Sequence, residues 1–337
     1  MKNSQTSYIR RRLSLLLPLL ALTLAAALLS LVLGAVNVPL GEVFAALFSG
    51  GDGSAGARIV LYARLPRVLG CILAGSALAV SGAITQSVLA NPLAAPSTIG
   101  VNSGAGLAAA LCCAVAPSMQ ALVPVAAFFG ALLSALLVLF IAERTGASRL
   151  TLILAGVAVS NVLAAAVDAV VTFFPDALNG YSDFRIGSLA NLSLERLTAP
   201  SLVTVLALAA ALSLTNELDV LSLGRETARS LGLNAGRARI LLLAVAAALA
   251  GAAVSFSGLL GFIGLIVPHM LRRFTGDESA SLLPACALGG ASLLLICDLG
   301  SRTLFAPYEL PVGIVLSFAG GPFFIFLLLR QRKGRVV

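Results

Sequence analysis

The chain has 337 residues, of which 59% are hydrophobic and only 11% are charged, and its formal net charge is +8 at pH 7. Soluble domains average roughly 45–50% apolar and about 25% charged residues, so the composition excludes an ordinary soluble enzyme and a disordered chain. We therefore expect an all-α integral membrane protein.

Long apolar runs follow one another along the chain. Residues 68–142 contain no Asp, Glu, Lys or Arg, and one helix of that length would far exceed the ~30 Å core of a bilayer. The run must fold back, and Asn91 with Pro92, Pro96 and Pro117 are the natural breaks. A β-barrel would show alternating segments of ~10 residues instead. About ten spans are predicted, at 13–34, 66–90, 98–116, 121–142, 150–173, 198–215, 238–257, 260–273, 281–303 and 310–329, of which the eighth is too short to cross fully.

The first run follows three arginines at 10–12 and is longer than a signal-peptide core, so we interpret it as the first span. Basic residues favour the cytoplasmic side of a membrane. With the amino terminus inside, 16 of the 22 basic residues face the cytoplasm and six face outside: Arg58, Arg64, Arg67, Arg185, Arg196 and Arg302. Both termini are thus predicted to be cytoplasmic, in a multi-pass protein of the inner or plasma membrane. The net charge requires no nucleic-acid partner.

Reactive side chains are few. The five cysteines, Cys71, Cys112, Cys113, Cys286 and Cys297, lie in apolar stretches without metal-ligand spacing. With a single histidine, the chain is predicted to bind no metal and no cofactor. No serine–lysine, His-Glu-x-x-His or paired-aspartate pattern predicts an intramembrane enzyme.

Small residues crowd the second and third predicted spans, at 75–83 and 100–106. Such faces let helix backbones approach closely where water cannot drive association. Two interpretations stay open, tight bundle packing and the lining of a path for a bulky solute.

Three stretches go beyond generic membrane composition. The first contains RLPR at 64–67, GSALAVSG at 75–82, Gln86, NPLAAP at 91–96 and GVNSGA at 100–105. The second is GLLGFIGLIVPH at 258–269, followed by Arg272. The third contains DLGSR at 298–302, ELPVG at 309–313 and GGPFF at 320–324. In this order and spacing the chain resembles the FecCD-type permeases, the membrane subunits of ABC importers for iron–siderophore complexes, haem and cobalamin. The resemblance spans residues 58–330.

The resemblance implies a fold like that of the cobalamin importer permease, with residues 1–337 forming one transmembrane domain. The length left outside the spans is too short for a soluble domain of ~100–150 residues, so no ATPase domain is expected. The implied partners are cytoplasmic ATP-binding subunits that use ATP and Mg, an extracytoplasmic solute-binding protein, and a second permease copy or a paralogue. Within the motifs, the resemblance implies translocation or structural roles for Ser81, Gln86, Asn91, Pro92, Gly104, Pro268 and His269.

An energy-coupling segment is predicted in the cytoplasmic loop 218–237. Its sequence ETARSLG at 226–232 is compatible with a short helix ended by glycine. It also resembles the coupling loop of ABC importers, in which an acidic residue is followed by alanine two positions on and glycine six positions on. The expected contact residues are Glu226, Ala228, Arg229, Leu231 and Gly232. Taken alone, the segment favours a solvated charged loop, and the surrounding family resemblance reverses this preference.

Three of the outward arginines, Arg64, Arg67 and Arg302, are predicted to lie at the outer mouth. In the resembling family, arginines at these positions meet acidic residues of the binding protein, and the arginine fork suits carboxylates. The alternatives are snorkelling of the side chains to the headgroups and, for Arg302, a pair with Asp298 one helical turn earlier.

Ionisable residues within spans usually indicate function. Asp168, Asp298 or His269 could therefore serve an ion-gradient-driven secondary transporter, which is the alternative function. Both aspartates are expected near the outer ends of their spans, where water reaches them. The loop 174–199 resembles a family segment rich in tryptophan, yet it carries Phe184 and Glu195 and no Trp.

Overall fold

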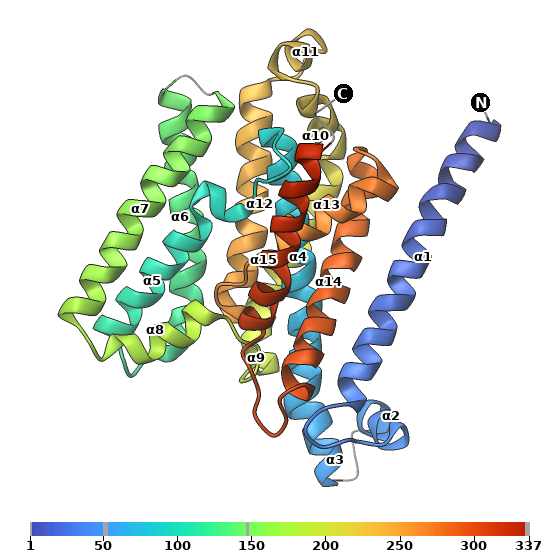
Figure 1. The fold of residues 1–337 in the computed structure, drawn as a ribbon, viewed down its shortest axis with the longest axis vertical. Helices are drawn as coiled ribbons and strands as arrows, with labels where there is room; N and C mark the ends of the chain where they lie inside the picture. Colours follow the sequence, from blue (N-terminus) through green and yellow to red (C-terminus); the bar gives the residue numbers. More distant parts are fainter. Residues whose placement is uncertain (1, 50–52, 146–147, 334–337) are drawn as a thin grey trace.

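The computed structural model describes residues 2–49, 53–145 and 148–333, and these residues are helical almost throughout (Figure 1). The all-α expectation is confirmed, and each predicted span corresponds to one long helix. These helices are α1 (Lys2–Val32), α4 (Leu65–Leu89), α5 (Val101–Val115), α6 (Val123–Arg144), α7 (Arg149–Phe173), α9 (Leu194–Ser213), α12 (Ala235–Ser257), α13 (Ile263–Thr275), α14 (Ser279–Thr303) and α15 (Val312–Lys333).

Seven helices of the described residues are long and apolar enough to cross a membrane: α1, α4 with the turns before it, α6, α7, α9, α12 and α14. The apolar parts of α5 and α15 are shorter. Helix α13 has 13 residues, or about 20 Å of rise, in line with the expectation that the eighth span does not cross fully. The total of ten crossings stays a prediction.

Helix α4 forms the centre of the bundle. In its most apolar window 83% of the residues are buried, against 22% in α1, which stands at one edge (Figure 1). Helices α14, α12 and α13 pack around α4, and α5 packs on α6 and α7. The buried part of α4 is rich in Gly, Ala and Ser, and these small side chains let the neighbouring helices approach closely.

The predicted break after α4 is confirmed. The helix ends at Leu89, and Ala90 adopts the left-handed conformation with φ of 44°. The amide of Asn91 then donates to the Gln86 carbonyl at 3.1 Å, and the Asn91 side chain accepts from the amide of Leu93 at 2.9 Å. Pro92 and the short 3₁₀ turn η2 (Pro96–Ile99) carry the chain into α5.

The structure adds short helices that the sequence pattern does not predict. They are α2 (Leu40–Ser49), α3 (Ala55–Arg58), the π-helical turn η1 (Ile59–Arg64) that runs into α4, the 3₁₀ turn η3 (Gln120–Leu122), α8 (Ala177–Ile186) and α10 (Thr215–Ser222), whereas α11 (Arg225–Ser230) corresponds to the short helix predicted at 226–232. Each of the unpredicted helices is too short to give a clear periodic signal, since a helix of 3–10 residues covers at most about three turns.

Helix α2 exposes one apolar stripe. Leu40, Phe44 and Phe48 follow at four-residue spacing and are 49%, 49% and 82% exposed, and the two phenyl rings stack with centroids 6.2 Å apart. The opposite side of the helix buries Val43 and Ala46. Helix α2 lies at the end of the molecule away from α11 (Figure 1).

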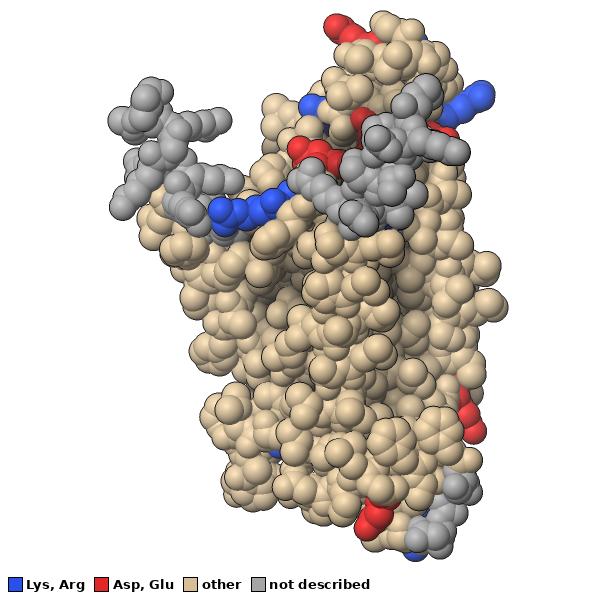
Figure 2. Space-filling model, turned by 90° about the vertical axis from the view of Figure 1, so that its right-hand side faces the viewer, with Lys and Arg blue, Asp and Glu red and all other residues tan. Residues whose placement is uncertain are grey.

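The surface has the banded character of a membrane protein. Figure 2 shows a face whose middle carries no charged side chain among the described residues, with Lys, Arg, Asp and Glu toward the two ends. The beginning of α1, the end of α15 and helix α11 lie at the same end (Figure 1). We refer to the end that carries α11 as the inner end.

Candidate functional site

Helix α11 is the part of the predicted coupling loop that projects from the inner end (Figure 1). Ala228 is fully buried, whereas Glu226, Arg229, Leu231 and Gly232 are exposed. Gly232 has φ of 83° and donates to the Arg229 carbonyl at 2.9 Å, and the next amide donates to the Ala228 carbonyl at 2.9 Å. These two bonds form a Schellman motif, which ends a helix at a left-handed glycine. The expected short helix with a glycine stop is confirmed.

The exposed side of this segment combines apolar and charged side chains. Leu223, just before α11, and Leu231, just after it, are each 63% exposed. Glu226 and Arg229 lie exposed between them. We call these four residues the α11 surface. Its leucines can anchor in an apolar groove of a partner and its charges can orient the contact. The predicted role in ATPase coupling stays a prediction.

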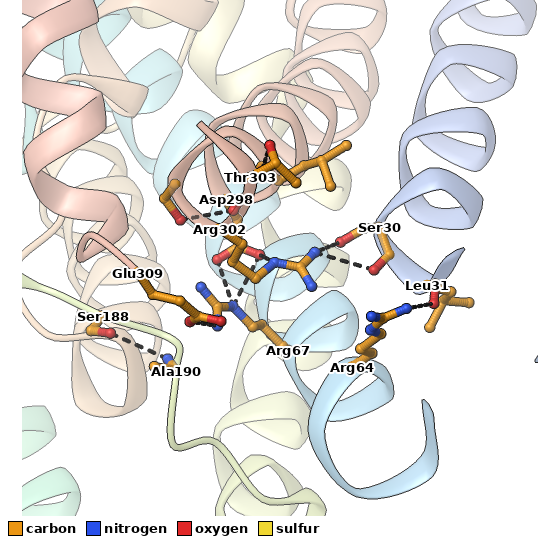
Figure 3. Close-up of polar contacts among 12 residues, drawn as sticks. Ser30, Leu31, Arg64, Arg67, Ser188, Ala190, Asp298, Arg302, Thr303 and Glu309 are labelled. Carbon is orange, nitrogen blue, oxygen red and sulfur yellow. Dashed lines mark hydrogen bonds and ion pairs between the residues drawn. The ribbon is translucent and has the colours of Figure 1, made fainter. Parts of the chain in front are cut away.

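A cluster of charges lies at the outer end (Figure 3). Arg67 of α4 reaches Asp298 of α14, with Nε 2.8 Å from Oδ1, and its Nη1 lies 2.8 Å from Oε2 of Glu309. Arg302 lies one turn after Asp298 and its Nε is 3.2 Å from Asp298 Oδ2. Asp298 is therefore held between two arginines, as the intrahelical alternative for Arg302 anticipated.

The cluster also secures the end of α1. Arg302 Nη2 donates to the Ser30 carbonyl at 3.1 Å and to the Ser30 hydroxyl. Arg64 Nη1 donates to the carbonyl of Leu31 at 2.6 Å (Figure 3). It also donates to the carbonyl of Val32 at 2.8 Å, and Nη2 donates to the carbonyl of Val36. The last carbonyls of a helix lack intrahelical partners and carry partial negative charge, so a guanidinium is a favourable cap.

The expected exposure of these arginines at an outer mouth is wrong for this structure. Arg64, Arg67 and Arg302 are 5%, 6% and 4% exposed. Asp298 is fully buried, so the expectation that water reaches it is also wrong. The physical reason is that remote carbonyls and carboxylates of the same chain satisfy the guanidinium groups and permit their burial. Docking of a binding protein by these arginines stays a prediction.

The motif residues of α4 serve helix–helix contacts. Ser81 donates through its hydroxyl to the Ala246 carbonyl of α12 at 2.6 Å. Gln86 Nε2 donates to the carbonyls of Gly264 and Leu265 at 3.3 Å, and its Oε1 has no hydrogen-bond partner among the described residues. Asn91 and Pro92 form the turn described above.

Glycines of the motifs lie where backbones touch. A Cβ placed on Gly82 would overlap the Gly264 carbonyl of α13, and one on Gly75 would overlap the Gly290 carbonyl of α14. Gly104 of α5 stands in the same relation to Gly130 of α6. Tight packing is thus the observed role of these small residues, and the lining of a path stays a prediction.

Pro268 and His269 lie in the middle of α13, where Pro268 is buried and His269 is half-buried. One turn on, Arg272 donates to the Ser87 hydroxyl of α4 at 2.8 Å and pairs with Asp277 at 2.8 Å. Asp168 of α7 is exposed. In the part of the chain that the structure describes, no three His, Cys, Asp or Glu side chains meet as they would around a metal ion.

Helix α8 is fixed to the ends of α12 and α15. Tyr181 and Phe184 are buried, and Phe184 accepts a hydrogen bond from the amide of Leu259 at 2.9 Å. The amide of Gly313 donates to the Gly187 carbonyl at 3.2 Å. Burial raises the pKa of the Tyr181 hydroxyl. Phe184, expected where relatives have Trp, is a core contact here.

A cavity of about 520 Å³ opens beside α8, where the ends of α5, α6, α9 and α12 meet. Its polar lining includes Asn179, Asp183, Asn191 and Arg196. The sequence interpretation missed these residues because it treated 174–199 as a loop. The polar composition of this segment between two apolar spans is the signal that could have found them.

Comparisons with known proteins agree with this architecture. A sequence profile described as the FecCD transport family matches residues 22–330. A hemin transport system permease protein of Yersinia pestis is 41% identical over 317 residues, covering 91% of this chain and 94% of that protein. A ferric enterobactin transport system permease protein of Escherichia coli is 39% identical and covers 94% of this chain and 95% of its own length. A solved structure described as an inward-facing conformation of a putative metal-chelate type ABC transporter superposes with a TM-score of 0.82 at 28% identity, covering 94% of this chain and 99% of the other.

Proposed function

Because the chain belongs to the FecCD transport family, we propose that it is the membrane-spanning permease subunit of an ATP-driven importer that carries a metal chelate inward. The observation that carries this proposal is the match along nearly the whole chain to transport permeases, together with a helical bundle of the same shape. The subunit opens alternately to the two sides of the membrane, and it is a transport subunit, not an enzyme.

Energy enters at the inner end. The α11 surface projects beyond the bundle and is built on a short helix that Gly232 terminates. A cytoplasmic ATP-binding subunit docks on this surface, uses ATP and Mg, and displaces α11 as it closes. The permease itself binds neither. The family resemblance of the 226–232 segment to coupling loops supports this role.

A solute-binding protein delivers the chelate at the outer end. The cavity beside α8 opens in this region and presents Asn179, Asp183 and Arg196. A second copy of the permease, or a paralogue, completes the transmembrane unit. We propose a homodimer, in which each half is one chain that covers 94–95% of the length of single permease relatives.

The transported solute is proposed to be an iron–siderophore complex or a related chelate such as haem or cobalamin. The names of the relatives support iron chelates, because they specify hemin, ferric enterobactin and Fe(3+)-citrate. These chelates range from an anionic catecholate complex to a planar porphyrin. What they share as transported solutes is therefore the need for a wide path, and not recognition by one set of polar side chains.

Reconstitution tests the function. The permease is placed in proteoliposomes with its ATP-binding subunit inside and its binding protein outside, loaded in turn with an iron catecholate, iron citrate or haem. Uptake of one chelate should require ATP, the binding protein and the ATPase. Full uptake by the permease alone under a proton gradient would instead establish the secondary-transporter alternative with Asp168, Asp298 or His269.

A further inference from the structure

The first turn of α14 is capped by a residue from the segment that precedes α11. Asp219 of α10 accepts a hydrogen bond through Oδ1 from the backbone amide of Ser279, at 2.9 Å. Ser279 is the first residue of α14 and is 1% exposed. Glu278, at the N-cap position, makes no side-chain capping bond. A carboxylate near the positive end of a helix is stabilising, and here it comes from 60 residues earlier in the chain.

Helix α10 is well placed to transmit a displacement of α11. Leu218 and Leu221 are 0% and 2% exposed, so α10 is embedded in the bundle. Only Leu223 and Gly224 separate α10 from α11. The amide of Gly224 donates to the Leu221 carbonyl at 3.2 Å, which shortens the connection further. A displacement of α11 therefore has to pass through only two linking residues and the last turn of α10 to reach Asp219.

Helix α14 connects the two ends of the molecule. From Ser279 to Asp298 it rises about 28 Å, nearly the thickness of a bilayer core. At its outer end Asp298 and Arg302 hold Arg67 of α4 and Ser30 of α1 (Figure 3). Along its length it packs closely on α4. Close-packed interiors transmit strain, so a displacement at one end of this helix can be passed to the other.

We propose that Asp219 is a positioning residue that joins the coupling segment to α14, so that displacement of α10 and α11 shifts α14 and reaches the charge cluster at the outer end. This inference rests on the proposed function, in which an ATPase docks on α11. It adds a specific mechanical link, since the bond between Asp219 and Ser279 is a polar contact between α10 and the first residue of α14.

The two partners of this bond can be removed independently. Asp219→Ala deletes the acceptor. Ser279→Pro deletes the donor, and proline is favoured at the first position of a helix. The preceding residue, Glu278, has φ of −70° and ψ of 114°, which a following proline accepts. Asp277→Ala is the matched control, because it removes an exposed carboxylate two residues before α14 that pairs with Arg272 of α13.

The test is transport per ATP hydrolysed in proteoliposomes that contain the ATPase and the loaded binding protein. We expect Asp219→Ala and Ser279→Pro each to lower this ratio at least fivefold, as coupling energies between sites typically do, and the double variant to be no worse than either. Asp219→Asn, which keeps an acceptor oxygen, should retain most coupling, and Asp277→Ala all of it. Wild-type ratios in both single variants, or losses that multiply in the double variant, would overturn the inference.

A distance measurement separates coupling from a purely structural cap. Spin labels on Leu304, at the outer end of α14, and Leu178, on α8, occupy exposed sites. In the wild-type complex the distance between them should change when ATP is bound, and in Ser279→Pro this change should disappear although the variant elutes and melts as a folded protein. An unchanged response in Ser279→Pro would refute the link. Absence of ATP-dependent uptake by the wild type would instead refute the proposed function itself.

Discussion

Arg67 of α4 and Asp298 of α14 form an ion pair inside the bundle, with the Arg67 Nε 2.8 Å from the Asp298 Oδ1 (Figure 3). Asp298 also faces Arg302, and Arg67 also faces Glu309, whose side chain is 40% exposed. The pair thus links two central helices to the connection between α14 and α15. Because both charges are buried, each depends on the other for its stability in the fold.

Removal of the buried aspartate should destabilise the chain. Asp298→Ala leaves Arg67 and Arg302 buried without their shared carboxylate, and breaking such a pair typically costs about 3–5 kcal/mol. We expect a lower thermal midpoint and a lower folded yield in detergent. Asp168→Ala, at an exposed position of α7, should leave both unchanged. Equal stability of the two variants would show that the buried cluster contributes nothing.

The same cluster makes a prediction about docking. If Arg67 acts through its internal partners, Arg67→Glu should reduce the amount of folded protein, since it places a third carboxylate beside Asp298 and Glu309. The affinity of the remaining folded molecules for the solute-binding protein should stay unchanged at low and high salt. Docking by this arginine would instead be established by two results together. Arg67→Glu would bind the solute-binding protein more weakly than the wild type at low salt, and high salt would weaken binding by the wild type.

Glycine contacts in the core should tolerate no added methyl group. Gly82→Ala would drive a Cβ into the backbone of α13, and overpacking of this kind costs about 1–3 kcal/mol or more. Gly321→Ala in α15 is the control, because nothing lies within 4 Å of its Cβ position. Thermal unfolding in detergent should therefore show a large loss for Gly82→Ala and no loss for Gly321→Ala. Similar midpoints would contradict the close approach of α4 and α13.

The residue that ends α11 should need to adopt the left-handed conformation, but it does not need to be small. Gly232 has φ of 83°, yet no atom lies within 4 Å of its Cβ position. Gly232→Val should therefore loosen α11 and uncouple ATP hydrolysis from uptake, whereas Gly232→Asn should preserve coupling because asparagine adopts this conformation more readily. Uptake and hydrolysis are measured together. Equal coupling in both variants would remove the helix stop from the mechanism.

The stripe on α2 should lie in the outer interface of the membrane, where aromatic side chains concentrate. The chain contains no Trp, so Phe48→Trp creates a single fluorescent reporter. In bilayers without partners, brominated lipids should quench it and iodide should not. Leu223→Trp, on the α11 surface, should show the reverse. Iodide quenching of the Phe48→Trp reporter would place α2 in water.

Local sequence features were sufficient to predict the long helices, the break after α4 and the short coupling helix of this protein. The apolar runs predicted the long helices, because a chain crossing lipid must satisfy its backbone within each helix. Asn91 and Pro92 predicted the break after α4, since proline cannot continue a helix. The ETARSLG segment predicted a short helix that ends at Gly232, because its glycine accepts the left-handed conformation. The family resemblance rested on motif order, which is also a property of the sequence.

Only the tertiary structure decided where the charges lie. Arg67 and Asp298 are separated by 231 positions, and Arg302 and Ser30 by 272. Near the end of a span, an arginine can reach the headgroups or turn inward, and the choice depends on whether a distant acceptor is present. Asp219 and Ser279 show the same dependence at the inner end. The sequence by itself determined the long helices and the family to which the chain belongs. The packing of α1, α4 and α14 decided which polar groups could be buried, because burial is favourable only when partners from remote segments converge.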